Sequence, residues 1–302
     1  MFFDLHADIL YDIVQKRLAG KKHIIKDYHL PQLEKGKIIG GIWCYYTDIN
    51  NELCPFEKAL ELLFAELEDV KDYVKIIKKQ DDIDLHKINV ILGLESLAPV
   101  KDLEHLENLY QLGFRHAMLT WNEANQFATG VKGEATRGLT ALGKEVINFM
   151  IKNKMIIDIS HANLQTVEDI LAITKKIIAS HSNVYELCAH PRNLPLSYIK
   201  KISQSEGLIG ITAVKAFVNP DNPTISNMIK HVDYLLSYGI ENYISFGFDF
   251  MDYMNIENLT DFHNASETEK VISELKERDF NKELIDKLTY QNALNFICNY
   301  LT

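Results

Sequence analysis

The sequence predicts an α/β protein that folds as one (β/α)₈ barrel, a TIM barrel, over residues 1–302. Three observations lead to this fold class. The chain has 302 residues, and α/β barrels commonly hold about 250 residues or more in one domain. Its composition, 47% hydrophobic and 25% charged, is typical of a globular protein with a large core. Short β-rich runs also alternate with longer helical segments along the whole chain.

Eight apolar runs are the expected strands. Their residues are almost continuously apolar rather than alternating, which is the pattern of parallel strands that are covered on both faces. The runs are Phe2–Leu5, Ile38–Tyr46, Ile88–Leu94, Phe114–Thr120, Met155–Ile159, Lys176–Ser180, Gly207–Ala213 and Tyr243–Phe248.

Amphipathic segments between these runs are the expected helices. Phe56–Val74 follows Pro55, a favourable helix-opening residue, and its apolar positions recur at helical spacing. Asn163 is expected to cap the helix that follows it, and Ser266 with Glu269 has the spacing of a capping box. The tail from Ser266 to Leu301 is expected to form two helices. The other expected helices are Leu139–Ile151, Leu164–Ile173, Leu194–Ser203 and Ile225–Leu236.

A doubly wound open sheet is the alternative fold. That fold would be favoured by a glycine-rich phosphate-binding sequence, G-x-G-x-x-G, after the first strand. Here the first run is followed by His6-Ala7-Asp8, which favours the barrel.

Charge and cysteine content limit the partners and the compartment. The net charge of −10, from 32 Lys and Arg against 42 Asp and Glu, argues against a nucleic-acid partner. Four sparse cysteines without CxxC spacing are typical of a reducing compartment. The chain opens without a signal-peptide pattern, and no apolar run approaches the roughly 18–20 residues that span a bilayer. We therefore expect a cytoplasmic protein with no membrane partner.

Polar residues that close the predicted strands indicate a metal site. The first run ends in His6 and Asp8, the third in Glu95, the fifth in His161 and the sixth in His181. The carboxyl ends of all strands meet at one end of a barrel, where active sites lie. Three imidazoles and two carboxylates suit borderline ions such as Zn²⁺, and a bridging carboxylate can hold two ions about 3.5–4 Å apart.

Two further residues at the same end have alternative interpretations. Asp249 closes the eighth run and is either a structural carboxylate or a general acid/base beside the metal site. Arg192 follows the sixth run and is either part of a surface ion pair or a bidentate clamp for a substrate carboxylate.

The other histidines are expected to have no role in the site. His231 is expected on a helix face and His116 inside the fourth strand, whereas His190 lies in a loop near Arg192 and could line the site. The remaining five are expected at the surface: His23, His29, His86, His105 and His263.

Seven segments, in order and at similar spacing, resemble the membrane (renal) dipeptidase family of zinc metallopeptidases. The resemblance runs from Phe3 to the Asn292–Phe296 tail. The segments are Asp4-Leu5-His6-Ala7-Asp8, Gly93-Leu94-Glu95, Leu119-Thr120-Trp121-Asn122, Asp158-Ile159-Ser160-His161, Ser180-His181-Ser182-Asn183, Arg192-Asn193-Leu194-Pro195 and Gly247-Phe248-Asp249-Phe250.

The resemblance implies a barrel of the metal-dependent hydrolase type with two Zn²⁺ ions, other divalent metals being open. His6 and Asp8 would hold one ion, His161 and His181 the other, and Glu95 would bridge them. A hydroxide between the ions would hydrolyse a small dipeptide, often one with a D-residue at its C-terminal position. The similarity is to the cytoplasmic prokaryotic branch of the family, and a homodimer is a further expectation.

By the same resemblance, Asp249 matches the catalytic acid/base and Arg192 the arginine that binds the substrate carboxylate. Trp121 and Asn122 are expected to line the substrate site. Trp121 stands where the renal enzymes carry a substrate-contacting histidine, and indole cannot replace imidazole in stabilising charge. The family's Asp-Phe-Asp-Gly sequence is Asp249-Phe250-Met251-Asp252 here, so its second aspartate is displaced.

Two other functions stay open at this point. One is a different metal-dependent amidohydrolase on the same barrel, although such enzymes usually begin with His-x-His and this chain has His6-Ala7-Asp8. The other is a non-catalytic descendant that acts as a binding protein, for which Trp121 is the one favourable feature.

Overall fold

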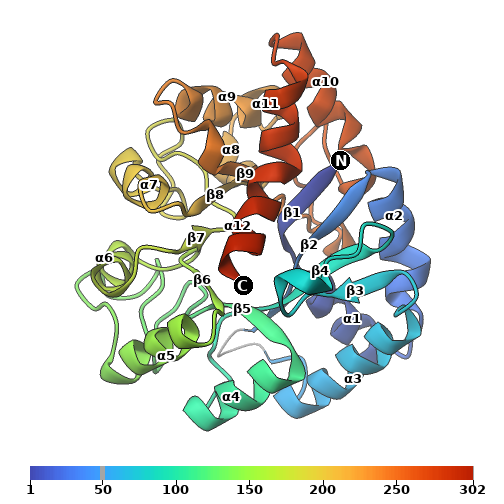
Figure 1. Ribbon diagram of the computed structural model, residues 1–302, viewed down its shortest axis with the longest axis vertical. Coiled ribbons are helices and arrows are strands. Elements are labelled where there is room, and N and C mark those ends of the chain that lie inside the picture. Colours follow the sequence, from blue (N-terminus) through green and yellow to red (C-terminus); the bar gives the residue numbers. More distant parts are fainter. Residues whose placement is uncertain (48–51, 302) are drawn as a thin grey trace.

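The computed structural model describes residues 1–47 and 52–301, and its centre is a closed barrel of eight parallel strands (Figure 1). The ring closes because the first strand pairs with the second on one side and with the last on the other. All eight predicted runs contribute strands, so the predicted fold class is confirmed. In ring order they are β1 (Phe2–Ala7), β2 (Ile38–Tyr46), β4 (Ile88–Glu95), β5 (Phe114–Met118), β6 (Ile156–Asp158), β7 (Ile178–Ala179), β8 (Leu208–Ile211) and β9 (Ile244–Phe246).

One further strand, β3 (Val74–Ile76), was not predicted. It pairs with the first half of β4, opposite Ile88–Val90, whereas β5 pairs with the second half from Leu92 onward. The helix predicted over Phe56–Val74 is therefore too long, and α3 spans Phe56–Asp69. Val70 and Val74, which follow α3, are both buried. They continue the apolar spacing of the helix in the sequence, although the chain has left the helix.

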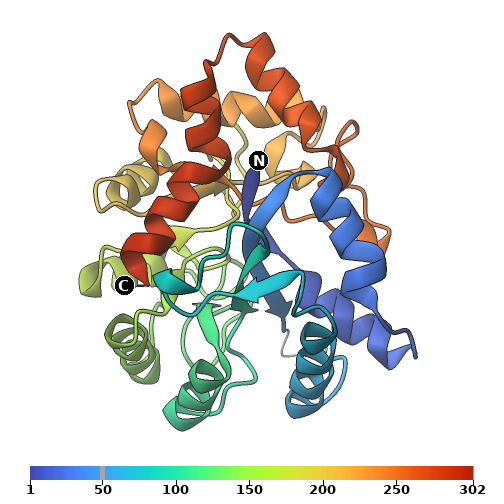
Figure 2. The same ribbon diagram turned by 45° about the vertical axis from the view of Figure 1, so that its right-hand side comes forward.

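Helices surround the barrel in both views (Figure 1, Figure 2). Two predicted helices, α6 (Leu164–Ile173) and α9 (Ile225–Leu236), have the predicted bounds, and Asn163 caps α6 by accepting the Thr166 N–H at 2.8 Å. The others are α1 (Ile9–Leu18), α2 (Leu30–Lys35), α4 (Leu103–Leu112), α5 (Ala141–Lys152), α7 (Leu196–Ser203), α8 (Lys215–Val218), α10 (Glu269–Glu277), α11 (Lys282–Asp286) and α12 (Asn292–Tyr300). No helix in the described parts of the chain is both long and apolar enough to cross a bilayer.

The C-terminal segment differs from the prediction of two helices. It forms three, because a π-helical turn at Lys287–Gln291 separates α11 from α12. The predicted capping box at Ser266 is also wrong: Asn264 accepts the Ser266 N–H, and α10 begins only at Glu269.

Helix α12 covers one opening of the barrel (Figure 1). Its side chains Phe296, Ile297 and Tyr300 pack in one apolar cluster with inward-facing strand residues such as Phe3 and Leu5. The Tyr300 hydroxyl donates to the carbonyl of Met155, which precedes β6. Since this contact lies before the start of a strand, α12 closes the N-terminal end of the barrel. The C-terminal end is thereby left for a site.

Two histidines away from that end are buried. His29, expected at the surface, lies with Nε2 2.8 Å from Asp12 Oδ2. His231 on α9 is 1% exposed, accepts the Val184 N–H at Nδ1 and donates from Nε2 to the Val218 carbonyl, both at 3.1 Å. Burial lowers the pKa of His231 to about 4, so the folded chain holds its neutral form.

We predict that His231 makes the fold acid-sensitive. Its pKa is about 6.5 in the unfolded chain and about 4 in the folded one, so its stabilising effect is complete above pH 6.5 and is lost as the pH falls to 4. The difference corresponds to about 3 kcal/mol. His231→Gln should be less stable at pH 7, yet lose about 3 kcal/mol less than the wild type between pH 6.5 and 4 in urea unfolding. Identical pH dependence of the two proteins would contradict the assignment.

Candidate metal centre

The predicted metal ligands come together at the C-terminal end of the barrel. His6 lies within β1, Asp8 directly follows it, and Glu95 is the last residue of β4. His161 and His181 lie in the turns just after β6 and β7. Parallel strands bring these five side chains to one edge although they are far apart in sequence.

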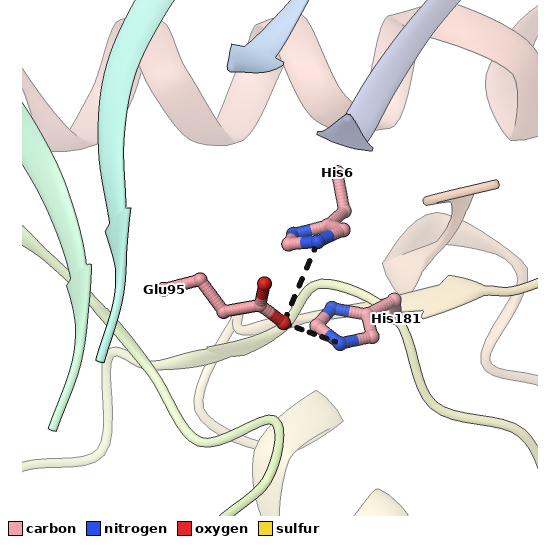
Figure 3. Close-up of side chains that lie close together, drawn as sticks. All are labelled: His6, Glu95 and His181. Atoms are coloured by element: carbon pink, nitrogen blue, oxygen red, sulfur yellow. Dashed lines mark ion pairs between the residues drawn. The ribbon is translucent and has the colours of Figure 1, made fainter. Parts of the chain in front are cut away.

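One oxygen of Glu95 is the centre of this arrangement, and we call Glu95 with His6, His161 and His181 the Glu95 group. Glu95 Oε1 lies 2.7 Å from His161 Nε2, 3.6 Å from His181 Nε2 and 3.7 Å from His6 Nε2. Figure 3 shows His6 and His181 directed at this oxygen from different elements. His6, Glu95 and His181 offer ligand atoms that all lie within 4.8 Å of one another, which is close enough to share a metal ion.

A second candidate group adjoins the first through His6. His6 Nε2 lies 3.5 Å from Asp8 Oδ1 and 3.9 Å from Asp249 Oδ1, and these three residues also meet the distance for a shared ion. The sequence left Asp249 as either a structural carboxylate or a general acid/base, and did not predict it as a metal ligand. Its position next to Asp8 places a third carboxylate within reach of the same ion.

Unsatisfied buried atoms indicate that these groups fit a metal. Among the residues that the structure describes, both ring nitrogens of His6 and Asp8 Oδ1 are buried and have no hydrogen-bond partner. Buried polar atoms rarely remain unpaired in this way, because their desolvation costs free energy. Nitrogen and oxygen donors in this mixture suit Zn²⁺ and similar divalent ions.

The electrostatics favour a bound cation. Burial raises the pKa of Glu95 well above its usual value, and the nearby Asp8 carboxylate raises it further. Burial also raises the pKa of Asp249 to about 6 and lowers the pKa values of His161 and His181 well below their usual range. A divalent cation would lower the raised pKa values of the two carboxyl groups, and it would bind the neutral imidazoles that burial already favours.

Hydrogen bonds from outside the group orient its histidines. His161 Nδ1 donates to Asn122 Oδ1 at 3.0 Å, so its Nε2 presents a lone pair toward Glu95. Ser180 Oγ lies 2.9 Å from His181 Nδ1 and fixes the second ring. Asn122, expected to line the substrate site, lines the cavity and also holds His161.

Asp158 is a supporting residue that the sequence analysis did not identify. Its Oδ1 accepts the N–H groups of Ser160 at 2.9 Å and Ser180 at 3.2 Å, while Oδ2 lies 2.8 Å from His116 Nε2. All four residues are buried. Asp158 thus connects the turns that carry His161 and His181. The feature of the sequence that could have identified Asp158 is its position at the end of a strand, two residues before Ser160.

Strained backbone marks the same rim. Ser96, His161 and Asp249, none of which is glycine, have φ in the left-handed region, at 89°, 71° and 56°. Such conformations are uncommon for L-residues and persist where surrounding contacts enforce them, often at functional sites. Asn258 supports Asp249 by donating to its carbonyl at 2.8 Å.

A cavity of about 370 Å³ opens above the group, and four other predicted residues, Trp121, Asn122, Arg192 and Asp249, line it. Arg192 is 4% exposed and makes no ion pair among the described residues, so it is not a surface ion-pair residue. Burial lowers its pKa to about 10, which leaves it protonated at neutral pH. His190 is not part of this lining, but its Nδ1 accepts the Arg192 N–H at 3.2 Å.

Tyr253 is a cavity residue that the sequence analysis missed. It follows β9 in a short 3₁₀ turn, and its hydroxyl donates to Asp8 Oδ2 at 3.3 Å. Asp8 therefore presents Oδ1 toward His6 while Oδ2 is held by the phenol. No periodic or motif signal singled out this tyrosine.

One protein family matches nearly the whole chain. The sequence model of the family described as "Membrane dipeptidase (Peptidase family M19)" matches residues 1–299. The dipeptidase aclJ of Aspergillus oryzae is 24% identical over 292 residues, which are 88% of this chain and 68% of that protein.

Two solved structures share the fold along nearly the whole chain. A metallopeptidase from Rhodobacter sphaeroides, solved with a phosphinate mimic of the dipeptide L-Ala-D-Ala, has a TM-score of 0.86 and 18% identity, covering 100% of this chain and 99% of that one. The dipeptidase AC, a metallopeptidase of family M19, has a TM-score of 0.87 and 20% identity, covering 99% and 98%.

We predict that Asp158 supports both the fold and the metal centre. Asp158→Ala should lower the free energy of unfolding by about 3–5 kcal/mol, because it leaves His116 and two buried N–H groups unpaired. It should also weaken metal binding by about 10- to 100-fold. The exposed Asp81→Ala is the control and should change stability by no more than about 0.5 kcal/mol. Equal stabilities of the two variants in urea would disprove the supporting role.

Proposed function

The chain belongs to the membrane dipeptidase family, peptidase family M19, and we propose that it is a di-zinc enzyme that hydrolyses small dipeptides. The observation that carries this proposal is the Glu95 carboxylate among three imidazoles, in a cavity that also holds a buried arginine. The first arrangement suits metal-assisted hydrolysis, and the second suits a substrate with a free carboxylate.

We assign five residues to the metals. His6 and Asp8 would hold one ion, His161 and His181 the other, and Glu95 both, which agrees with its central position. When bound, the ions supply Lewis acidity, which acidifies water and polarises the amide carbonyl. Zinc is the metal that the nitrogen and oxygen donors favour, and other divalent ions are outcomes of the metal analysis.

Arg192 would bind the C-terminal carboxylate of the substrate. Its guanidinium is buried, charged and without a carboxylate partner in the described structure, and two parallel N–H···O bonds would fix the peptide's orientation. Since Arg192, Glu95 and His161 line one cavity of about 370 Å³, a short peptide would fit between the guanidinium and the Glu95 carboxylate. This arrangement would limit the length of the substrate.

Asp249 would move the proton. Its side chain lines the cavity, and its Oδ1 lies 3.9 Å from His6 Nε2. A carboxyl group therefore stands beside the assigned metal ligands, where a general acid/base is needed. It would accept a proton from the attacking water and deliver it to the departing amide nitrogen. The left-handed backbone at Asp249 and the Asn258 hydrogen bond hold the carboxylate beside His6 for this purpose.

Two further parts of the proposal concern the substrate's stereochemistry and the cellular compartment. The Rhodobacter sphaeroides relative was solved with a mimic of L-Ala-D-Ala, so we propose that this chain also accepts a D-residue at the C-terminal position. All four cysteines are unpaired, which supports a reducing compartment such as the cytoplasm. A different amide substrate is the alternative that the following assay distinguishes.

The direct test pairs metal analysis with hydrolysis of a dipeptide library that contains L-L and L-D pairs. We expect near two metal ions per chain and cleavage only of peptides with a free C-terminal carboxylate. His161→Ala should abolish cleavage and lower the metal content, whereas His86→Ala, an exposed histidine, should change neither. Metal-loaded protein that cleaves no dipeptide would refute the proposed substrate, and full activity of His161→Ala would refute the ligand assignment.

The role of Arg192 has its own prediction. Arg192→Lys should raise KM for L-Ala-D-Ala by about 10- to 100-fold with a smaller change in kcat, because a charge-assisted bidentate contact is lost. Lys132→Ala is the control and should leave this KM unchanged. It removes another positive charge near the site, since the Lys132 ammonium lies 5.4 Å from the Trp121 ring centroid. C-terminally amidated peptides should be poor substrates of the wild type and no worse with Arg192→Lys. An unchanged KM would exclude the clamp.

A further inference from the structure

Three aromatic side chains line one side of the cavity as a continuous row. The rings of Tyr11 and Tyr46 are 5.2 Å apart between centroids, and those of Tyr46 and Trp121 are 5.0 Å apart, both edge to face. All three line the cavity above the Glu95 group. We call Tyr11, Tyr46 and Trp121 the aromatic row.

The aromatic row lies across the barrel mouth from Arg192. Tyr46, its middle member, is the last residue of β2, and Arg192 follows β7. In the ring of eight strands, β2 and β7 are four strands apart in either direction, so they stand on opposite sides. Tyr11 and Trp121 extend the row from α1, which follows β1, and from the end of β5.

The Glu95 group lies between these two sides. The ring of Trp121 is 5.7 Å from that of His161, whose Nε2 is 2.7 Å from Glu95 Oε1. A dipeptide with its carboxylate on Arg192 and its amide above Glu95 must therefore extend its N-terminal residue toward the aromatic row. The length of a dipeptide, two residues of about 3.3–3.6 Å each, sets this order of contacts.

From this geometry we infer that the aromatic row is the subsite for the N-terminal side chain, and that it selects large apolar or aromatic side chains. The inference rests on the proposed dipeptidase function. Aromatic faces bury apolar side chains favourably, and aromatic pairs gain further from edge-to-face contact. Trp121 is thereby a specificity-determining residue.

Lys132 offers a competing contact for acidic side chains. Its Nζ lies 5.4 Å from the centroid of the Trp121 ring, within reach of a carboxylate that rests on the indole. An acidic N-terminal side chain could therefore pair with Lys132. The substrate series must for this reason compare methionine with glutamate, two side chains of similar length.

The test measures kcat/KM for L-Xaa-D-Ala, where Xaa is Ala, Met, Phe or Glu. We expect Phe and Met to exceed Ala by about tenfold or more, and Glu to equal or fall below Ala. Trp121→Ala should reduce the Phe-to-Ala ratio by roughly tenfold and leave the ratios of an L-Ala-D-Xaa series unchanged. Tyr73→Ala truncates an exposed aromatic next to β3, outside the cavity, and should leave all ratios unchanged.

Binding of phosphinate dipeptide mimics separates this inference from the proposed function. Calorimetry should show the mimic with an N-terminal Phe side chain binding about tenfold or more tighter than the one with Ala, and Trp121→Ala should remove the difference. Thermal unfolding would confirm that both variants are folded. If no dipeptide is cleaved but this discrimination is found, the proposed function fails and the subsite stands.

The converse outcomes overturn the subsite. Cleavage of dipeptides with a Phe-to-Ala ratio near one, or with a ratio that Trp121→Ala does not change, refutes the aromatic row and leaves the dipeptidase function intact. Preference for Glu over Met assigns the selection to Lys132 instead. Absence of any difference between the two mimics in binding also refutes the inference.

Discussion

The buried carboxylate of Glu95, surrounded by three histidines, is the interaction on which the site depends. A carboxylate with little water around it is costly to ionise, and burial raises its pKa accordingly. The imidazoles of His161 and His181 are themselves kept neutral by burial. His6 differs from them: burial opposes its charged form, but Cys44 and Glu95 raise its pKa well above the usual range. One imidazole is therefore the only cation of the group itself, and divalent cations would supply the further positive charge that its carboxylates favour. Arg192, which is buried nearby, carries the charge suited to a substrate carboxylate.

The interior of the barrel is built to hold this group in place. Asp158 joins the β6 and β7 turns to His116, whose Nδ1 lies 3.9 Å from Cys44 Sγ. Gly93 makes room for this layer, because a Cβ there would lie 2.6 Å from His116 Nδ1 and 2.9 Å from Cys44 Sγ. Glycine two residues before Glu95 is thus required by the packing beneath the site. Helix α12 closes the other end of the barrel with apolar side chains.

Most of the fold and the membership of the site followed from the sequence, because both depend on strand ends. Continuous apolar runs located all eight barrel strands, and the polar residues that close them, such as His6 and Glu95, are brought together by any parallel barrel. The ninth strand, β3, was missed because Val70 and Val74 continued the apolar spacing of α3 while the backbone changed conformation. Features that depend on side-chain contacts in three dimensions were also missed. The burial of His29 against Asp12 and the Tyr253 contact with Asp8 leave no local pattern in the sequence.

The central claim is that the strand ends form a two-metal centre around Glu95. The most direct measurement is a crystal structure of the zinc-loaded protein, with anomalous diffraction recorded on both sides of the zinc absorption edge. The account predicts two anomalous peaks that share Glu95, one next to His6 and Asp8 and the other next to His161 and His181. Peaks located elsewhere, or the absence of any zinc peak at Glu95 in zinc-soaked crystals, would contradict it.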